Sequence, residues 1–206
     1  LEFRRVLFRS ALAANLGREV RIGDVHPHLV SGWQSGVGLG LGVEVENVEI
    51  ADDPRFGIEP LARIETVEAR LAARSLWHLR LEFSNIVLRN PSVNLVWDNS
   101  DEWNLLALPL GGNSPGGMAG DSVSGQGHYP DVRIVDGRLN FKLDGRKKSF
   151  YLTELFVELG APRNADQPWD VKFALTPSRT SFEQVPAIVV RGEGQLGPFA
   201  GEIGRA

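Results

Sequence analysis

The chain has 206 residues, with 22 Lys and Arg, 26 Asp and Glu and no Cys, and its formal net charge is −4. Its basic residues are scattered among acidic ones, which argues against a nucleic-acid partner and against strong binding to an anionic lipid surface. Without Cys there is no disulfide framework and no thiolate or zinc-thiolate chemistry.

Both ends of the sequence resemble translated sequencing adapters. Residues 1–10 (LEFRRVLFRS) and 202–206 (EIGRA) are therefore set aside as scars. The single Met is Met118, so we expect the natural protein to extend beyond both ends. Between the scars we expect a strand-rich part at 11–110, a mobile Gly/Ser-rich linker at 111–130, and a second strand-rich part at 131–201.

The first elements combine a helix end with strands. Residues 11–16 are rich in Ala and Leu and precede Gly17, which predicts the end of a short N-terminal helix. A strand is expected to begin at Val20 and to be interrupted at Pro27. In residues 36–50 the apolar alternation shifts phase by one residue at Asn47, which indicates a bulge or bend.

Period-two alternation then predicts several short strands. Residues 53–57 form an expected turn, Ile86 and Leu88 lie in the opposite phase to Phe83, and residues 102–108 suggest one helical turn. Alternating side chains share one face of a strand. We expect the following apolar residues on one concave face: Val67, Ala69, Leu71, Leu79, Leu81, Phe83, Val93, Leu95 and Trp97.

The same pattern resumes after the linker. Asp144-Gly145 predicts a tight hairpin, Asp136-Gly137 is better interpreted as a bulge, and residues 188–196 predict a last strand. These strands add five candidates for the apolar face: Leu139, Phe141, Leu143, Val171 and Phe173. The predicted fold is mainly β, an open, twisted, largely antiparallel sheet curled into a hydrophobic groove, with the short N-terminal helix.

No catalytic constellation accompanies the strands, and we expect neither an enzyme nor a metal or cofactor. His26 and His28 could face a metal but lack a third ligand nearby, and the Gly-rich run at 36–42 fits no phosphate-binding pattern. Several other polar groups have simpler structural interpretations as linker residues, a solvated hairpin edge or the polar face of strands: Ser122, Ser124, His128, Arg146, Lys147, Lys148, Asp52, Asp53, Glu44, Glu46 and Glu49.

Six segments in this order resemble the N-terminal region of the AsmA family of bacterial envelope proteins. They are GREVRIGDV, VEVENVEIADDPRFG, EPLARIETVEARLAARSL, LRNPSVNLVWD, EWNLLAL and VRIVDGRLNF. The resemblance implies an inner-membrane helix preceding this fragment, a location on the periplasmic side of the bacterial inner membrane, and a sheet with a hydrophobic groove. It also implies a part in outer-membrane biogenesis and in the movement of phospholipid between membranes.

We therefore expect a non-enzymatic segment that shields phospholipid acyl chains in its groove. A different interpretation stays open at this point, in which the chain is a structural or glycan-binding β-sandwich or solenoid. In that case Trp33, Trp97 and Trp103 are the aromatic side chains that could stack on sugars, although Trp97 continues the apolar alternation of its strand.

Overall fold

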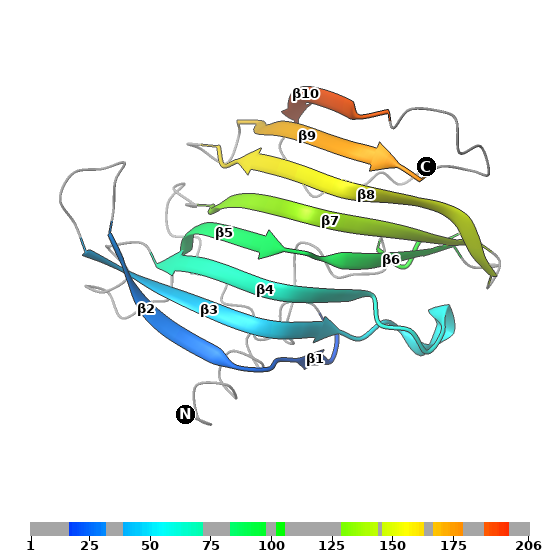
Figure 1. Cartoon of the computed structure of the whole chain (residues 1–206), viewed down its shortest axis with the longest axis horizontal. Helices are drawn as coiled ribbons and strands as arrows, with labels where there is room; N and C mark the ends of the chain where they lie inside the picture. The colour runs from blue at the N-terminus through cyan, green and yellow to red at the C-terminus, as the bar shows by residue number, and fades with distance from the viewer. Residues whose placement is uncertain are drawn as a thin grey trace.

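The computed structural model describes residues 17–31, 39–71, 83–97, 102–105, 129–143, 146–162, 167–178 and 188–197. Within these ranges the protein is mainly β, with one ten-stranded sheet and no α-helix. Figure 1 shows the strands side by side in a single layer, with β1 and β2 at one margin and β10 at the other. The helix expected at residues 11–16 lies outside the described residues.

The strands follow the order of the sequence closely. Their spatial order is β1 and β2 beside β3, then β4, then β5 and β6 end to end, then β7, β8, β9 and β10. Their bounds are β1 (Val20–Arg21), β2 (Val25–Ser31), β3 (Leu39–Ile50), β4 (Ala62–Leu71), β5 (Phe83–Arg89), β6 (Ser92–Trp97), β7 (Asp131–Leu143), β8 (Arg146–Gly160), β9 (Trp169–Pro177) and β10 (Val190–Leu196).

The sheet is mixed. Eight of the ten strand pairings among the described residues are antiparallel, as expected, and β7 pairs in parallel with both β5 and β6. Parallel neighbours need a long connection that returns the chain to the same end of the sheet. Residues 98–130 separate β6 from β7 in the sequence, and most of them, including residues 111–128 of the expected linker, lie outside the described residues.

Two local predictions have different outcomes. β7 and β8 pair Leu143 with Arg146, the geometry of a two-residue hairpin connection, as Asp144-Gly145 predicted. The interruption expected at Pro27 is wrong, because β2 continues through this residue, opposite Val43. Proline lacks an N–H but is tolerated here because β2 pairs only with β3 and forms an edge of the sheet.

A row of residues with left-handed backbone conformation crosses the middle of the sheet. Asn47, Asn90, Asp136 and Glu154 have φ angles of 53°, 50°, 55° and 51°. The strand registers place Asn47 opposite Glu65, Glu65 opposite Asn90, and Asn90 beside Asp136. We call this row the crease.

At the crease the strands change phase, so that apolar side chains stay on one face. Val45 and Val48 are an odd number of residues apart, yet both pack into the same core. The register of β3 with β4 does not slip there, so both strands change phase together. In β7 the register does shift between Ile134 and Gly137. The expected phase change at Asn47 and the bulge at Asp136-Gly137 are both confirmed.

The crease makes Asn47 a position where side-chain shape matters. Because a β-branched residue is strained at positive φ, Asn47→Val is expected to destabilise the fold by about 1–2 kcal/mol, whereas Asn47→Gly should cost little or nothing. Urea unfolding of the two variants and the wild type measures the difference. Equal stabilities of the Val and Gly variants would contradict a left-handed backbone at this residue.

The buried hydrophobic residues are concentrated in and around the first four strands. Of the twelve buried hydrophobic residues in the described part of the chain, ten lie at or before Ala69, and the other two are Val96 and Leu155. The central cluster consists of Val20, Val25, Val43, Val45, Val48 and Ile64. Burial is therefore concentrated at the β1–β4 end of the sheet.

A short turn at residues 102–105 is tied to the sheet by Asn104, which is fully buried. Its amide nitrogen donates to Asp52 Oδ2 at 2.6 Å and to the carbonyl of Asn94 at 2.8 Å, and its Oδ1 accepts from the Val96 N–H at 2.9 Å. Trp103 makes an antiparallel bridge to Trp97, and their rings meet edge to face at 5.0 Å. Within residues 102–105 the backbone forms this bridge at Trp103 and a turn at Asn104-Leu105, and the rest of the helical turn expected at residues 102–108 lies outside the described residues.

The neighbouring loop carries the short 3₁₀ helix η1 (Pro54–Phe56), which Asp53 caps by accepting from the Arg55 N–H at 3.1 Å. That backbone hydrogen bond, helped by nearby Arg18, holds the pKa of the Asp53 carboxyl below its usual value. The turn expected at residues 53–57 is confirmed.

Candidate functional site

The apolar face of the sheet is built from rows of residues that neighbour one another across the strands. Paired residues on neighbouring strands share a face, so the strand registers define each row. The longest row crosses eight strands from β2 to β10 and consists of Val25, Val45, Val67, Leu88, Ile134, Val157, Phe173 and Gly192.

Two further rows run parallel to it. One crosses the same eight strands and consists of Pro27, Val43, Ala69, Ile86, Val132, Leu159, Val171 and Gly194. The other lies beyond the crease and consists of Val20, Ile50, Ala62, Val93, Leu139, Leu152 and Pro177. We call the surface formed by these three rows and their continuation along β6 and β7 the apolar face.

The structure brings most of the predicted groove residues together on this face. Val93, Leu95 and Trp97 of β6 pair in register with the three candidates of β7. The ten candidates that the apolar face unites are Val67, Ala69, Val93, Leu95, Trp97, Leu139, Phe141, Leu143, Val171 and Phe173. Leu71 and Phe83 are register partners at the end of β4 and β5. Leu79 and Leu81 lie outside the described residues.

The sequence pattern missed Ile86 and Leu88, whose opposite phase set them apart from Phe83. The register between β4 and β5 shifts near Leu71, where Arg70 pairs with Asn85 but Leu71 pairs with Phe83. This irregularity adds one residue and returns Ile86 and Leu88 to the apolar face, opposite Ala69 and Val67. Because such a shift depends on the partner strand, the alternation of β5 alone could not reveal it.

Exposure rises along the long row. Val45 on β3 is 3% exposed, whereas Phe173 on β9 is 37% exposed. The residues between them, including Leu88, Ile134 and Val157, are half-buried. The apolar face therefore changes from a packed core over β1–β4 to a partly open surface over β7–β10.

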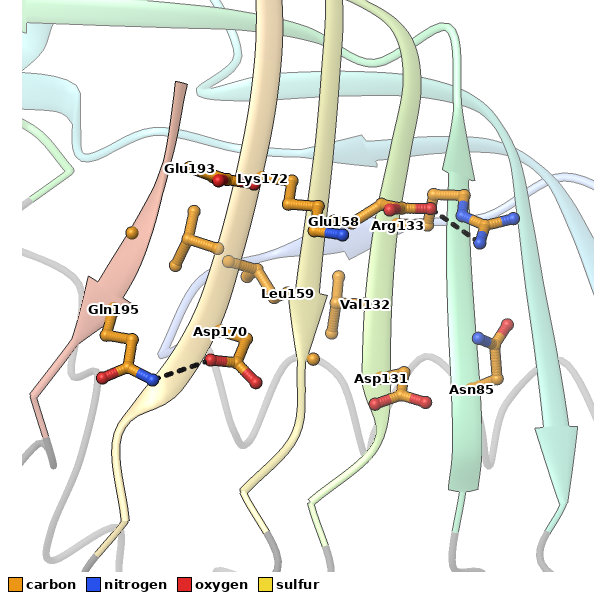
Figure 2. Close-up of a pocket in the computed structure, with 13 residues that line it drawn as sticks. Asn85, Asp131, Val132, Arg133, Glu158, Leu159, Asp170, Lys172, Glu193 and Gln195 are labelled. Carbon is orange, nitrogen blue, oxygen red and sulfur yellow. Dashed lines mark hydrogen bonds and ion pairs between the residues drawn. The ribbon is translucent and has the colours of Figure 1, made fainter. Parts of the chain in front are cut away.

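The opposite face is polar and carries a ladder of alternating charge. Arg133, Glu158, Lys172 and Glu193 are successive register partners on β7 to β10, and Arg133 Nη2 lies 2.7 Å from Glu158 Oε1. Figure 2 shows these four side chains in one line across the strands. Opposite charges directly across neighbouring strands stabilise a sheet.

A shallow pocket of about 690 Å³, called the basin below, is lined by this ladder and by neighbouring residues at the ends of the strands. Gly160 lacks a side chain there. The flanking carboxylate of Asp131 accepts a hydrogen bond from the Ala161 N–H. The carboxylate of Asp170 accepts one from Gln195 (Figure 2). Each of these carboxylates thus has a partner within the sheet. Several polar groups that line the basin are paired with one another or with the backbone. Among these lining residues there is no nucleophile set beside a general base and acid.

Other candidates for chemistry are scattered. His26 Nε2 lies 3.7 Å from Glu46 Oε1 and both imidazoles of β2 are exposed. The described ranges contain no group of three His, Cys, Asp or Glu that could hold a metal ion. The backbone of Arg146 to Lys148 belongs to β8. Four predicted or alternative site residues lie outside the described part of the chain: Trp33, Ser122, Ser124 and His128.

Comparisons with family models, with curated proteins and with solved structures return no match to this chain. Among the residues that the structure describes, no helix is long and apolar enough to cross a membrane.

Proposed function

We propose that this chain is a non-enzymatic, periplasmic segment of an AsmA-like protein anchored in the bacterial inner membrane. In this proposal its apolar face forms a groove that shields phospholipid acyl chains during outer-membrane biogenesis. The observation that supports it most is the continuity of the apolar rows across eight strands, from Val25 to the β10 edge. A sheet that only needed a core would not have to extend this row beyond the packed region.

The dimensions suit an acyl chain. Eight strands are separated by seven steps of about 4.8 Å, so the long row spans roughly 34 Å. One leaflet of a bilayer core is about 15 Å thick, so a single acyl chain covers less than half of the row. The partly open region over β7–β10 spans three of these steps, roughly 14 Å, which is close to the length of one chain, while the region over β1–β4 stays occupied by the protein core.

The free-energy cost of exposing lipid tails to water favours such a surface. A diacyl phospholipid carries about thirty methylenes, and exposing them to water costs on the order of 20 kcal/mol at about 0.8 kcal/mol each. Half-buried residues such as Val132, Val157 and Leu159 offer apolar contact without a polar group to desolvate. A strip of this kind lowers the cost of moving the tails through water.

The test places one charge on each face of the sheet. Val171→Arg puts a cation on the apolar face beside Gly194, whose Cβ position has no atom within 4 Å, so the long side chain has room to reach water. We expect this variant to stay folded and to lose most binding of a fluorescent phospholipid. Val87→Arg is the matched control, because Val87 lies on the polar face between Glu68 and Arg133 and should retain binding.

Native mass spectrometry of the wild-type chain provides the second measurement, and co-purified phospholipid is the expected adduct. If neither measurement detects lipid on the folded wild type, the proposal is wrong. Equal binding by the Val171→Arg and Val87→Arg variants would place any lipid elsewhere on the molecule. A glycan adduct in the absence of lipid would favour the glycan-binding alternative, for which Trp97 and Trp103, both half-buried and in ring contact, are the described candidates.

A further inference from the structure

The two edges of the sheet are protected to different degrees. At one edge, β2 carries Pro27, which has no N–H to offer to another strand. At the other edge, β10 pairs with β9 over seven consecutive residues without a register shift and contains no Pro. No described strand pairs with the outer side of β10, and all of its residues except Gly192 are exposed. A regular, exposed edge strand is a template for a further strand.

Apolar residues gather at the same edge. Five of the nine exposed large hydrophobic residues in the described ranges belong to β9, β10 or the two residues before β10. They are Phe173, Ile188, Val189, Val190 and Leu196. Four of the five alternate onto the apolar face, and Val189 has the opposite phase. The apolar face therefore reaches the open edge, where a neighbouring strand could cover it.

The sequence of β10 is complementary to itself in one antiparallel register. When Gly192 faces Gly192 of a second copy, Arg191 faces Glu193 and Glu193 faces Arg191, on the polar face. In the same register Val190 faces Gly194, whose Cβ position opens onto free space, and Ile188 faces Leu196. Antiparallel partners share a face, so the apolar pairs meet on the apolar face and the Arg191–Glu193 pairs meet on the polar face. The remaining pair, Val189 with Gln195, lies on the polar face at the margin of the contact.

We propose that the β10 edge is an interface for a second copy of this chain, joined strand to strand about a two-fold axis at Gly192. The ladder Arg133, Glu158, Lys172 and Glu193 alternates in charge and ends on a carboxylate at β10. Arg191 of the second copy would lie next to Glu193 and extend this alternation by one positive charge. A two-fold interface of this kind uses the same patch twice, so both charge pairs form together. The apolar faces of both copies would then lie on the same side of one continuous sheet.

Complementary charge variants test the register. Arg191→Glu places like charges opposite each other twice in the dimer, and so does Glu193→Arg. Each variant alone should dimerise at least about tenfold more weakly than the wild type in sedimentation velocity, because like charges opposite one another destabilise strand pairing. An equimolar mixture of the two variants should dimerise again, because the two glutamates of one variant then face the two arginines of the other.

Far-UV circular dichroism of each variant confirms that the fold is intact before the mixture is prepared. A wild type that stays monomeric at high concentration would overturn the proposal. So would a dimer that both variants leave unchanged, since the contact would then use another surface, or a mixture that fails to restore dimers. Lipid binding is not part of the readout, so the result is independent of the proposed function.

Discussion

Asn104→Ala is expected to lower the free energy of unfolding by about 3 kcal/mol or more. The side chain is fully buried and makes three hydrogen bonds, to Asp52, to the Asn94 carbonyl and to the Val96 N–H. Alanine cannot replace any of them, and buried polar groups left without partners cost about 1–3 kcal/mol each. Urea unfolding followed by tryptophan fluorescence measures the loss and also reports on the Trp97–Trp103 contact.

A control and a second variant make the result specific. Gln195→Ala removes an exposed hydrogen bond to Asp170 and should change stability by less than about 0.5 kcal/mol. Asn104→Asp keeps the shape but sets a second carboxylate against Asp52. Repulsion raises the pKa of one of the two carboxyls, so this variant should regain stability as the pH falls through that raised pKa. An Asn104→Ala protein as stable as the wild type would contradict the buried hydrogen-bond network.

Val45→Arg is expected to prevent folding or to destabilise the protein by several kcal/mol. Val45 is 3% exposed and belongs to the central cluster with Val43, Val48 and Ile64. An arginine there would bury an unpaired charge, and the cost is comparable with the whole stability of a domain of this size. Thermal and urea unfolding of the variant, or its failure to give a folded spectrum, provides the measurement.

The matched variant is Val171→Arg, the same exchange on the neighbouring row of the same face. We expect its free energy of unfolding to be close to that of the wild type, because the apolar face is partly open over β9 and Gly194 leaves room beside Val171. Similar large losses for both variants would mean that the apolar face is sealed along its whole length. That outcome would remove the main support for the lipid groove while leaving the strand order intact.

Several elements were predictable because their signals are local. Asp144-Gly145 predicts the β7–β8 hairpin, since this dipeptide suits the positive φ angles of a two-residue turn. The phase shift at Asn47 is visible in the order of Leu, Val and Glu along β3, and Asn is among the residues that adopt the left-handed conformation with least strain. Period-two alternation placed ten of the fourteen groove candidates on one face.

Other features depend on contacts between distant segments. The parallel pairing of β7 with β5 and β6 has no local signature, because alternation is the same whichever direction the neighbour runs. The position of Ile86 and Leu88 on the apolar face follows from a register shift against β4. From the sequence, Asn104 is an ordinary polar residue of a turn. Its complete burial is tolerated because Asp52, which is distant in the sequence, accepts a hydrogen bond from its amide.

Taken by itself, the sequence determined that the chain forms β-strands with one apolar side, because side-chain alternation and turn residues act over a few neighbours. The tertiary structure decided how the strands join and where the core closes. It aligned the left-handed residues of β3, β7 and β8 with Asn90 into one crease, and it buried the apolar face over β1–β4 while leaving it partly open over β7–β10. Burial depends on which segments lie opposite a side chain, and that arrangement is a property of the whole sheet.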